Sequence, residues 1–277
     1  MPERCLSIIL PCFNAEKTLE AALNSIRNQS FESWEIIAVD DGSTDSTYRI
    51  LKNFERRDRR IKVLRTERCG LVEALNKGVG QAQAELVARQ DADDESLPLR
   101  FALQVEFLRT HPEVSVVGCM VEDVPGFPSA EGYRRYMEWT NSIITPKDHW
   151  LNRFVDAPIV HPTIVVRRSI FERFGLYREN PPWPEDFEIF LRWFQMGVTF
   201  EKVPRVLYRW RERKDRLSRT CSRYSEEAFY RCKAHYLARG PLRDFKEVGI
   251  WGAGRVSRKR ASFLAVSYTH LTLPTKA

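Results

Sequence analysis

The feature that most limits the possible folds of this chain is the alternation of strand-like and helix-like segments through its first 110 residues. Short apolar runs alternate with segments in which apolar residues recur at helical spacing. The strand-like runs are residues 6–10, 35–39, 61–64, 86–88 and 114–117. The helix-like segments between them are residues 19–26, 48–54, 71–82 and 101–108. This alternation predicts an α/β fold with a mostly parallel central sheet flanked by helices.

The rest of the chain follows this pattern less regularly. Residues 122–160 contain pattern-breaking prolines and a glycine, and we expect loops and helices there. A further strand is predicted at 163–166, and an amphipathic helix opens just after Pro184. Two short strands are expected near residues 199–203 and 206–208.

Several classes of protein are excluded by the apolar runs and the cysteines. The longest nearly apolar stretch, residues 114–121, is far shorter than the roughly 20 residues that a membrane-spanning helix needs. The N-terminus lacks the pattern of a secretory signal. None of the six cysteines forms a Cys-x-x-Cys pair, so they are interpreted as reduced thiols. We therefore expect a cytoplasmic protein, with contact at the inner face of the membrane left open.

Positive charge is concentrated in one segment. Residues 205–260 contain 17 Lys and Arg against six Asp and Glu, whereas the whole chain has a net charge of +7. Such a segment attracts phosphate groups, so a nucleotide, a nucleic acid and an anionic membrane all remain candidate partners. A solvated basic helix face is the plain alternative.

Chemistry-bearing residues follow three of the predicted strands. In an open parallel α/β sheet, ligands bind beyond the carboxyl ends of the strands, and these ends share one edge. Five carboxylates at one edge repel one another unless a cation or hydrogen-bond donors compensate. The residues concerned are Pro11, Phe13 and Asn14 after the first strand, Asp40 and Asp41 after the second, and Asp91, Asp93 and Asp94 after the fourth.

A divalent metal ion would compensate these charges. Mg²⁺ and Mn²⁺ prefer oxygen ligands, and Mg²⁺ typically takes one or two protein carboxylates. Asp91 and Asp93 suit that role. Asp-x-Asp alone is a weak motif, and turn-forming aspartates after a strand are the alternative. Its position at a strand end favours the metal site.

Three motifs, Pro-x-Phe-Asn, Val-Asp-Asp-Gly-Ser-Thr-Asp and Asp-Ala-Asp-Asp, occur in this order. With them the chain resembles the family 2 inverting glycosyltransferases, from about residue 7 to residue 220. The resemblance implies a GT-A fold, a UDP-, dTDP- or GDP-sugar donor, and Mg²⁺ or Mn²⁺ as cofactor. It also implies a role in polysaccharide biosynthesis with a glycan, lipid-linked or protein acceptor, and no nucleic acid partner.

Roles for individual residues follow from this resemblance, position by position. In the donor-binding set that it implies, Pro11 and Phe13 would flank the nucleobase and Asp41 would accept a hydrogen bond from it. Asp91 would lie near the ribose or the metal, and Asn14 and Asp40 complete the set. Asp93, with Asp91, would hold the metal. Glu185 and Asp186 match a Glu-Asp pair in which the Asp is the general base, although acids also favour first helical turns because they complement the helix dipole.

The basic segment after residue 208 is predicted to cover the donor phosphates. Arg211 and Arg219 are the residues selected, because guanidinium groups bind phosphate through paired hydrogen bonds. Many relatives have a His at the position of Arg211, so this chain departs from the family pattern there.

Two other functions compete with this one. A glycine-rich, lysine-bearing phosphate loop near the N-terminus would indicate a nucleotidyltransferase-like enzyme, but this sequence has no such loop there. A nucleic-acid-binding module would use the basic segment but leaves the acidic strand ends unexplained.

The motifs suggest four parts of the chain. Residues 1–220 are expected to form the GT-A domain and residues 221–247 a helical linker. Residues 248–265 resemble the opening of a Rossmann-like domain, with a buried strand entering a glycine turn, but Ser257 replaces the third glycine and NAD binding is not supported. Residues 266–277 lose the charge pattern and are expected to be a non-native tail.

Overall fold

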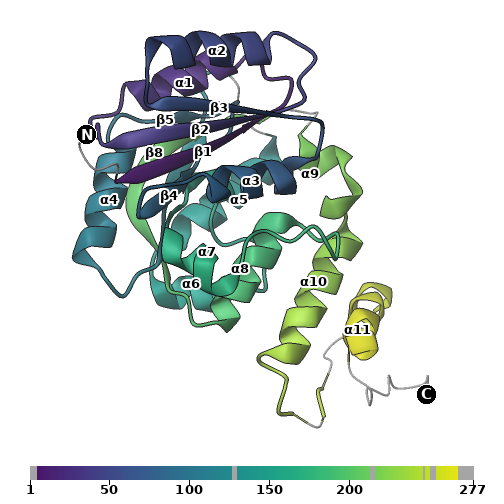
Figure 1. Ribbon diagram of the computed structural model, residues 1–277. Coiled ribbons are helices and arrows are strands. Elements are labelled where there is room, and N and C mark those ends of the chain that lie inside the picture. The colour runs from purple at the N-terminus through teal and green to yellow at the C-terminus, as the bar shows by residue number, and fades with distance from the viewer. Residues whose placement is uncertain (1–4, 127–129, 213–215, 246, 250–253, 268–277) are drawn as a thin grey trace.

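The computed structural model describes residues 5–126, 130–212, 216–245, 247–249 and 254–267. Within these residues an eight-stranded sheet has the order β3-β2-β1-β4-β7-β6-β8-β5 (Figure 1). The strands are β1 Leu6–Cys12, β2 Trp34–Asp41, β3 Ile61–Thr66, β4 Leu86–Arg89, β5 Glu95–Ser96, β6 Val116–Asp123, β7 Val165–Arg167 and β8 Phe200–Trp210.

Helices cover both faces of the sheet. One apolar core joins the sheet to α1, α2, α4 and α5, and the other joins it to α3, α7, α8 and α10. Figure 1 shows α1 and α2 on one side of β1–β3 and α3 on the other. The helices are α1 Leu19–Arg27, α2 Thr47–Arg57, α3 Leu71–Gly80, α4 Arg100–Thr110, α5 Glu131–Ser142, α6 Pro146–Asn152, α7 Arg168–Phe174, α8 Glu185–Gln195, α9 Leu217–Thr220, α10 Glu226–Arg239 and α11 Arg255–Ser267, with short 3₁₀ turns η1 His161–Thr163 and η2 Ser222–Tyr224.

The first four strands along the chain are parallel, as the sequence pattern predicts. β1 pairs in parallel with β2 and β4, and β2 pairs in parallel with β3. β7 then runs antiparallel to both β4 and β6, and β5 runs antiparallel to β8. The predicted α/β fold with a mostly parallel sheet is confirmed, and the carboxyl ends of β1, β2 and β4 lie at one edge.

The centre of the sheet is buried because helices cover both of its faces. Every residue of β1 and β2 is buried, which is typical of parallel strands between two helical layers. Helix α3 packs so closely on β1 that a Cβ built on Gly78 would lie 2.4 Å from Ile9 Cγ2. A glycine at this position is therefore required by the packing.

One prediction for the C-terminal half of the sheet is wrong in detail. The two short strands expected near 199–203 and 206–208 form the single strand β8. Its pairing with β6 shifts register, since Cys119 pairs with Val203 and Met120 with Val206. Pro204 lies in the shifted segment, and because proline has no N–H to donate, it is accommodated by a bulge within one strand.

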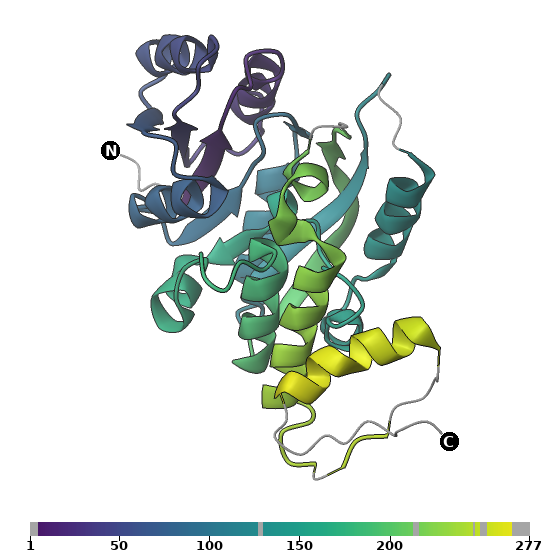
Figure 2. The same ribbon diagram turned by 90° about the vertical axis from the view of Figure 1, so that its right-hand side faces the viewer.

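The C-terminal helices extend the second layer. Figure 2 shows α8 and α10 side by side, with α11 lying against α10. The buried strand expected from residue 248 is wrong for 248–249, where Val248 is half-buried, Gly249 is exposed and neither is in a strand. Residues 250–253 and 268–277, on which the rest of the Rossmann-like opening and most of the tail fall, lie outside the described residues. The division of the chain into four parts therefore stays a prediction. None of the described helices is long and apolar enough to cross a bilayer.

Candidate functional site

The three predicted strand ends meet. Cys12, at the end of β1, pairs with Asp40 of β2 in the parallel register, and β4 is the other neighbour of β1. Burial, and after it the negative charges of Asp40, Asp91 and Asp93, raise the pKa of the Cys12 thiol. The carboxylates from two separate strand ends therefore act on one buried thiol at the end of the strand between them.

The segment after β1 places one aromatic ring at the surface. Phe13 is 36% exposed, and the guanidinium of Arg68 lies over its ring at 3.2 Å from the centroid. Asn14 has a left-handed backbone with φ of 46°, which asparagine tolerates better than most residues. Its N–H donates to Ser43 Oγ at 3.0 Å, and its Oδ1 accepts from the Thr44 N–H at 2.9 Å. These bonds tie the end of β1 to the turn after β2.

The aspartate that ends β2 orders the loop before α3. Asp41 Oδ1 accepts from the Cys69 N–H at 2.7 Å, and its Oδ2 accepts from the Gly70 N–H at 2.9 Å. Gly70 has φ of 88°, a left-handed conformation that glycine adopts without strain. Asp41 thus fixes the loop that carries Arg68 to Phe13.

Asp40 is completely buried beneath this turn. One oxygen, Oδ2, lies 3.5 Å from Arg65 Nε, and the other accepts from the Ser43 N–H at 3.4 Å. Although the sequence places Asp40 in the donor-binding set, the structure places it behind the site rather than on its surface.

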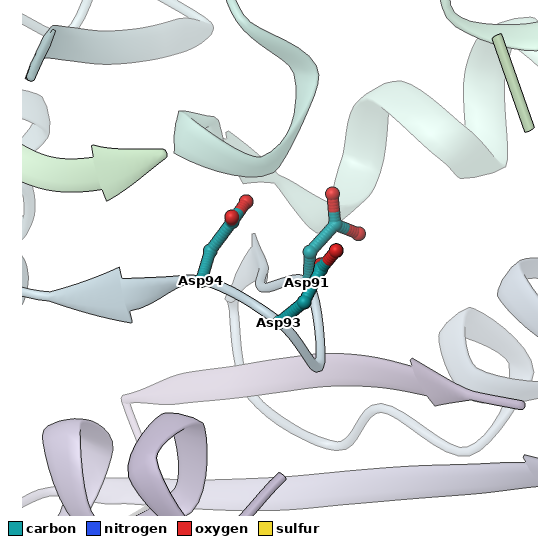
Figure 3. Close-up of side chains that lie close together, drawn as sticks. All are labelled: Asp91, Asp93 and Asp94. Atoms are coloured by element: carbon teal, nitrogen blue, oxygen red, sulfur yellow. The ribbon is translucent and has the colours of Figure 1, made fainter. Parts of the chain in front are cut away.

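Three aspartates after β4 form a compact carboxylate cluster. Oxygens of Asp91, Asp93 and Asp94 lie within 4.8 Å of one another, and Figure 3 shows the three side chains projecting from one turn. Carboxylate oxygens are the ligands that Mg²⁺ and Mn²⁺ prefer, so the donor set fits such an ion. The sequence selects Asp91 and Asp93 as ligands and omits Asp94, although the run Asp91-Ala-Asp-Asp contains the signal.

Asp94 is the innermost member of the cluster. It is fully buried, and it accepts hydrogen bonds from the Tyr208 hydroxyl at 2.9 Å and from the Arg211 N–H at 2.7 Å. Burial, together with the charges of Asp93 and Asp91, raises the pKa of Asp94. The hydrogen bond from Tyr208 therefore joins the carboxylate cluster to β8.

Arg89, the last residue of β4, connects the carboxylate cluster to α8. Its Nη1 lies 2.9 Å from Asp91 Oδ1, and its side chain is only 7% exposed. Burial raises the pKa of Glu185 and of Asp186, and the positive charge of the same guanidinium offsets part of that rise at both carboxyl groups. The two groups of acids predicted from the sequence thus share one buried arginine.

The acids that open α8 lie in a poorly solvated environment. Glu185 is 3% exposed, and burial raises its pKa. Burial, and after it the charge of Glu185, raises the pKa of Asp186 to about 7. The Phe187 N–H donates to Asp186 Oδ1 at 2.7 Å. A carboxylate with a pKa near neutrality is well suited to accept a proton as a general base.

The two arginines selected from the basic segment lie in different places. Arg211 is at the cluster, where its Nε donates to the Asp93 carbonyl at 3.0 Å and its Nη2 lies 3.6 Å from Glu95. Arg219 is instead ion-paired with Glu212 and lies over Tyr133, and no contact with the cluster is seen among the described residues.

Sequence reasoning missed two other arginines at this edge. Arg216 lies over the Trp210 ring, faces the three clustered aspartates electrostatically, and has a buried Nη1 without a hydrogen-bond partner in the described part of the chain. Arg100 is fully buried in α4 and donates to the Arg89 carbonyl at 2.9 Å. The basic run 209–216 could have pointed to Arg216, but nothing in the pattern around Arg100 distinguishes it from a surface residue.

Comparison with known proteins identifies the family. The sequence model of glycosyl transferase family 2 matches residues 7–175. The chain belongs to this family. It is 32% identical to EpsE of Bacillus subtilis (strain 168), which is named as a glycosyltransferase, over 87% of this chain and 85% of that protein. It is 28% identical to the amylovoran biosynthesis glycosyltransferase AmsE of Erwinia amylovora, over 77% of this chain and 78% of that protein.

Solved structures have the same fold as this family 2 glycosyltransferase. S. aureus TarS 1–349, in complex with UDP-GlcNAc, superposes with a TM-score of 0.69 at 20% identity, covering 95% of this chain and 71% of that one. The mannosyltransferase PcManGT from Pyrobaculum calidifontis, in complex with GDP-Man and Mn²⁺, gives 0.61 at 18% identity, covering 96% and 73%. The expectations of a GT-A fold and of a glycosyltransferase enzyme are both confirmed.

Proposed function

We propose that this enzyme transfers a sugar from a nucleoside diphosphate to an acceptor hydroxyl with inversion, in a reaction that depends on a divalent cation. One observation carries the proposal. Buried Arg89 pairs with Asp91 of the carboxylate cluster and acts electrostatically on Asp186 at the start of α8, which supports one site that combines groups for the leaving diphosphate with a base for the acceptor.

On the donor side, Asp91, Asp93 and Asp94 would hold Mg²⁺ or Mn²⁺. When bound, the cation supplies neutralisation of the charge that develops on the diphosphate leaving group. Phe13 would stack on the nucleobase beside Pro11, with Asn14 and Asp41 shaping the two loops around it. UDP-, dTDP- and GDP-sugars are the candidate donors, since TarS and PcManGT have been solved with UDP-GlcNAc and GDP-Man.

On the acceptor side, Asp186 would act as the general base. The acceptor hydroxyl attacks the anomeric carbon and passes its proton to the Asp186 carboxylate, while the bond from that carbon to the diphosphate oxygen breaks and its electron pair leaves with the diphosphate. Attack opposite to the leaving group inverts the configuration. Glu185, beside Asp186, supports the base by its negative charge.

The relatives support a proposal for the biological setting. Because AmsE is named for amylovoran biosynthesis, we propose a role in polysaccharide biosynthesis, with a glycan, lipid-linked or protein acceptor. A cytoplasmic position, including contact with the inner membrane face, belongs to the same proposal. No observation favours the nucleotidyltransferase or nucleic-acid-binding alternatives.

Binding measurements test the proposal directly. We expect UDP, dTDP or GDP, or one of their sugars, to raise the melting temperature in the presence of Mn²⁺ and to lose this effect in EDTA, because a ligand that binds the folded state stabilises it. Asp93→Asn should weaken that binding at least tenfold. Asp244→Asn, which changes an exposed carboxylate far along the chain, is the matched control. Cation-independent binding of every nucleotide would overturn the metal-dependent mechanism.

A further inference from the structure

A tyrosine from the C-terminal part of the chain contacts the proposed catalytic acids. The Tyr224 hydroxyl, in η2, donates to Glu185 Oε2 at 2.6 Å. Glu185 is 3% exposed, so water has little access to this carboxylate. Among the described side chains, Tyr224 is the one that donates a hydrogen bond to Glu185. The Tyr224 phenol is therefore the side-chain hydrogen-bond donor to this buried acid, alongside the backbone N–H of Glu185 itself.

The backbone around Tyr224 is held against the start of α8. The neighbouring Arg223 donates from Nη1 to the Trp183 carbonyl at 2.7 Å and from Nη2 to the Glu179 carbonyl at 3.0 Å. Nη2 also lies 3.0 Å from the Glu179 carboxylate. On the other side, Ser225 caps α10 by accepting from the Ala228 N–H at 3.2 Å. These bonds fix η2 between α10 and the loop that leads into α8, and they hold the Tyr224 side chain next to Glu185.

Resting on the proposed role of Asp186 as base, we propose that Tyr224 is a positioning residue that keeps Glu185 oriented and ionised as the negatively charged neighbour of that base. A hydroxyl that donates to a carboxylate favours its charged form, and a charged Glu185 makes it harder for Asp186 to lose its proton. Tyr224 thus acts on Asp186 through Glu185, without touching the substrate.

Other groups also act on the two acids, and they set the background for this effect. Arg89 and Arg223 favour the ionised forms, whereas Asp156 opposes ionisation of Asp186. The groups that face the pair from the elements packed against it are Arg89, Tyr136, Asp156, Tyr177, Arg223 and Cys232, besides Tyr224 itself. The two arginines remain in place when only the phenol is changed, so a Tyr224 variant isolates its own contribution.

The direction in which the pKa of Asp186 shifts can be worked out because Tyr224 contacts Glu185, and Glu185 in turn acts on Asp186. Without the Tyr224 hydroxyl, Glu185 loses its donor and keeps its proton to a higher pH. Asp186 then ionises beside a neutral neighbour, so it should lose its proton at a lower pH than in the unaltered enzyme. We expect a downward shift of roughly 0.5–1 pH unit for Tyr224→Phe, the size that loss of one hydrogen bond to a neighbouring charge produces. Glu185→Gln, which removes the neighbouring charge itself, should shift Asp186 in the same direction by at least as much.

The experiment follows the carboxyl ¹³C resonance of Asp186 through a pH titration, with Asp186→Asn used to assign the signal. Tyr236→Phe is the matched control, because the Tyr236 hydroxyl of α10 donates to Glu188 of α8 and its removal deletes the same kind of bond between neighbouring elements. A downward shift in Tyr224→Phe with no shift in Tyr236→Phe supports the proposal. An unchanged titration in Tyr224→Phe, or an equal shift in both variants, overturns it.

Failure of this inference and failure of the proposed function give different results. If Asp186→Asn retains sugar transfer, Asp186 is not the base, whatever the titration of the tyrosine variants shows. If Asp186→Asn is inactive while Tyr224→Phe leaves the titration of Asp186 unchanged, the base assignment stands and only the role of Tyr224 is wrong.

Discussion

Arg89 Nη1 and Asp91 Oδ1 form a 2.9 Å ion pair in which the arginine side chain is almost completely buried. Arg89 is the last residue of β4 and Asp91 is the first aspartate of the carboxylate cluster, so the pair links the end of the strand to the site. The same positive charge acts on Asp186 at the start of α8. A change at Arg89 should therefore affect stability and proton transfer together.

Arg89→Met should lower both the stability and the neutral-pH activity. Removing the arginine leaves Asp91 without its partner, and because Asp91 is partly exposed we expect a loss of about 2 kcal/mol in the free energy of unfolding, below the range for fully buried pairs. The pKa of Asp186 should rise, since the lowering effect of Arg89 is lost. Urea unfolding and the pH dependence of kcat/KM measure the two effects. An unchanged pH profile would show that Arg89 does not act on the base.

The pH dependence of the unaltered enzyme should reflect Asp186. The base must be ionised, and burial together with Glu185 raises its pKa to about 7. kcat/KM should therefore rise about tenfold per pH unit below pH 7 and level off above it. The profile is measured with a saturating cation and a fixed donor concentration. A rate that is already constant from pH 5 upward would exclude a base with this pKa.

Asp186→Asn should stabilise the fold at pH 8. Because the folded-state pKa lies near 7 and the ordinary value is 3.8, the folded carboxyl keeps a proton that the unfolded chain loses, and stability falls as the pH rises between these values. Asparagine removes this penalty. One pKa unit corresponds to about 1.4 kcal/mol, and sharing of charge with Glu185 reduces the total, so we expect a gain of roughly 2 kcal/mol at pH 8 and little change at pH 4. Equal effects at both values in urea unfolding would contradict this origin.

The strand ends could be predicted from the sequence because they depend on local patterns. A buried apolar run followed by acidic residues is readable wherever it occurs, and in a parallel sheet these ends must share an edge. Cys12 at the end of β1 and Asp40 at the end of β2 are accordingly paired neighbours at that edge. Such an edge requires parallel strands, which β3, β2, β1 and β4 are, whereas β7 runs antiparallel to β4.

The contacts that tune the site could not be predicted, because each joins residues far apart in the sequence. Tyr224 reaches Glu185 across 39 positions, and Tyr208 reaches Asp94 across 114. Arg211 and Arg219 look alike in the basic segment, yet one lies at the cluster and the other pairs with Glu212. Residue type alone does not distinguish an arginine that contacts the cluster from one that pairs elsewhere.

Arg100→Met should destabilise the fold by about 4 kcal/mol, because its guanidinium donates five buried hydrogen bonds that methionine cannot replace. Two of the acceptors are the Arg89 and Pro162 carbonyls, so the change should also loosen the turn that carries the carboxylate cluster and weaken Mn²⁺-dependent nucleotide binding. Arg109→Met, on the same helix, is the control, since Arg109 is 74% exposed and its solvent-exposed pair with Glu106 should contribute little to stability. Urea unfolding and calorimetry measure the two effects. Similar losses for the two variants would show that the buried network does not support the site.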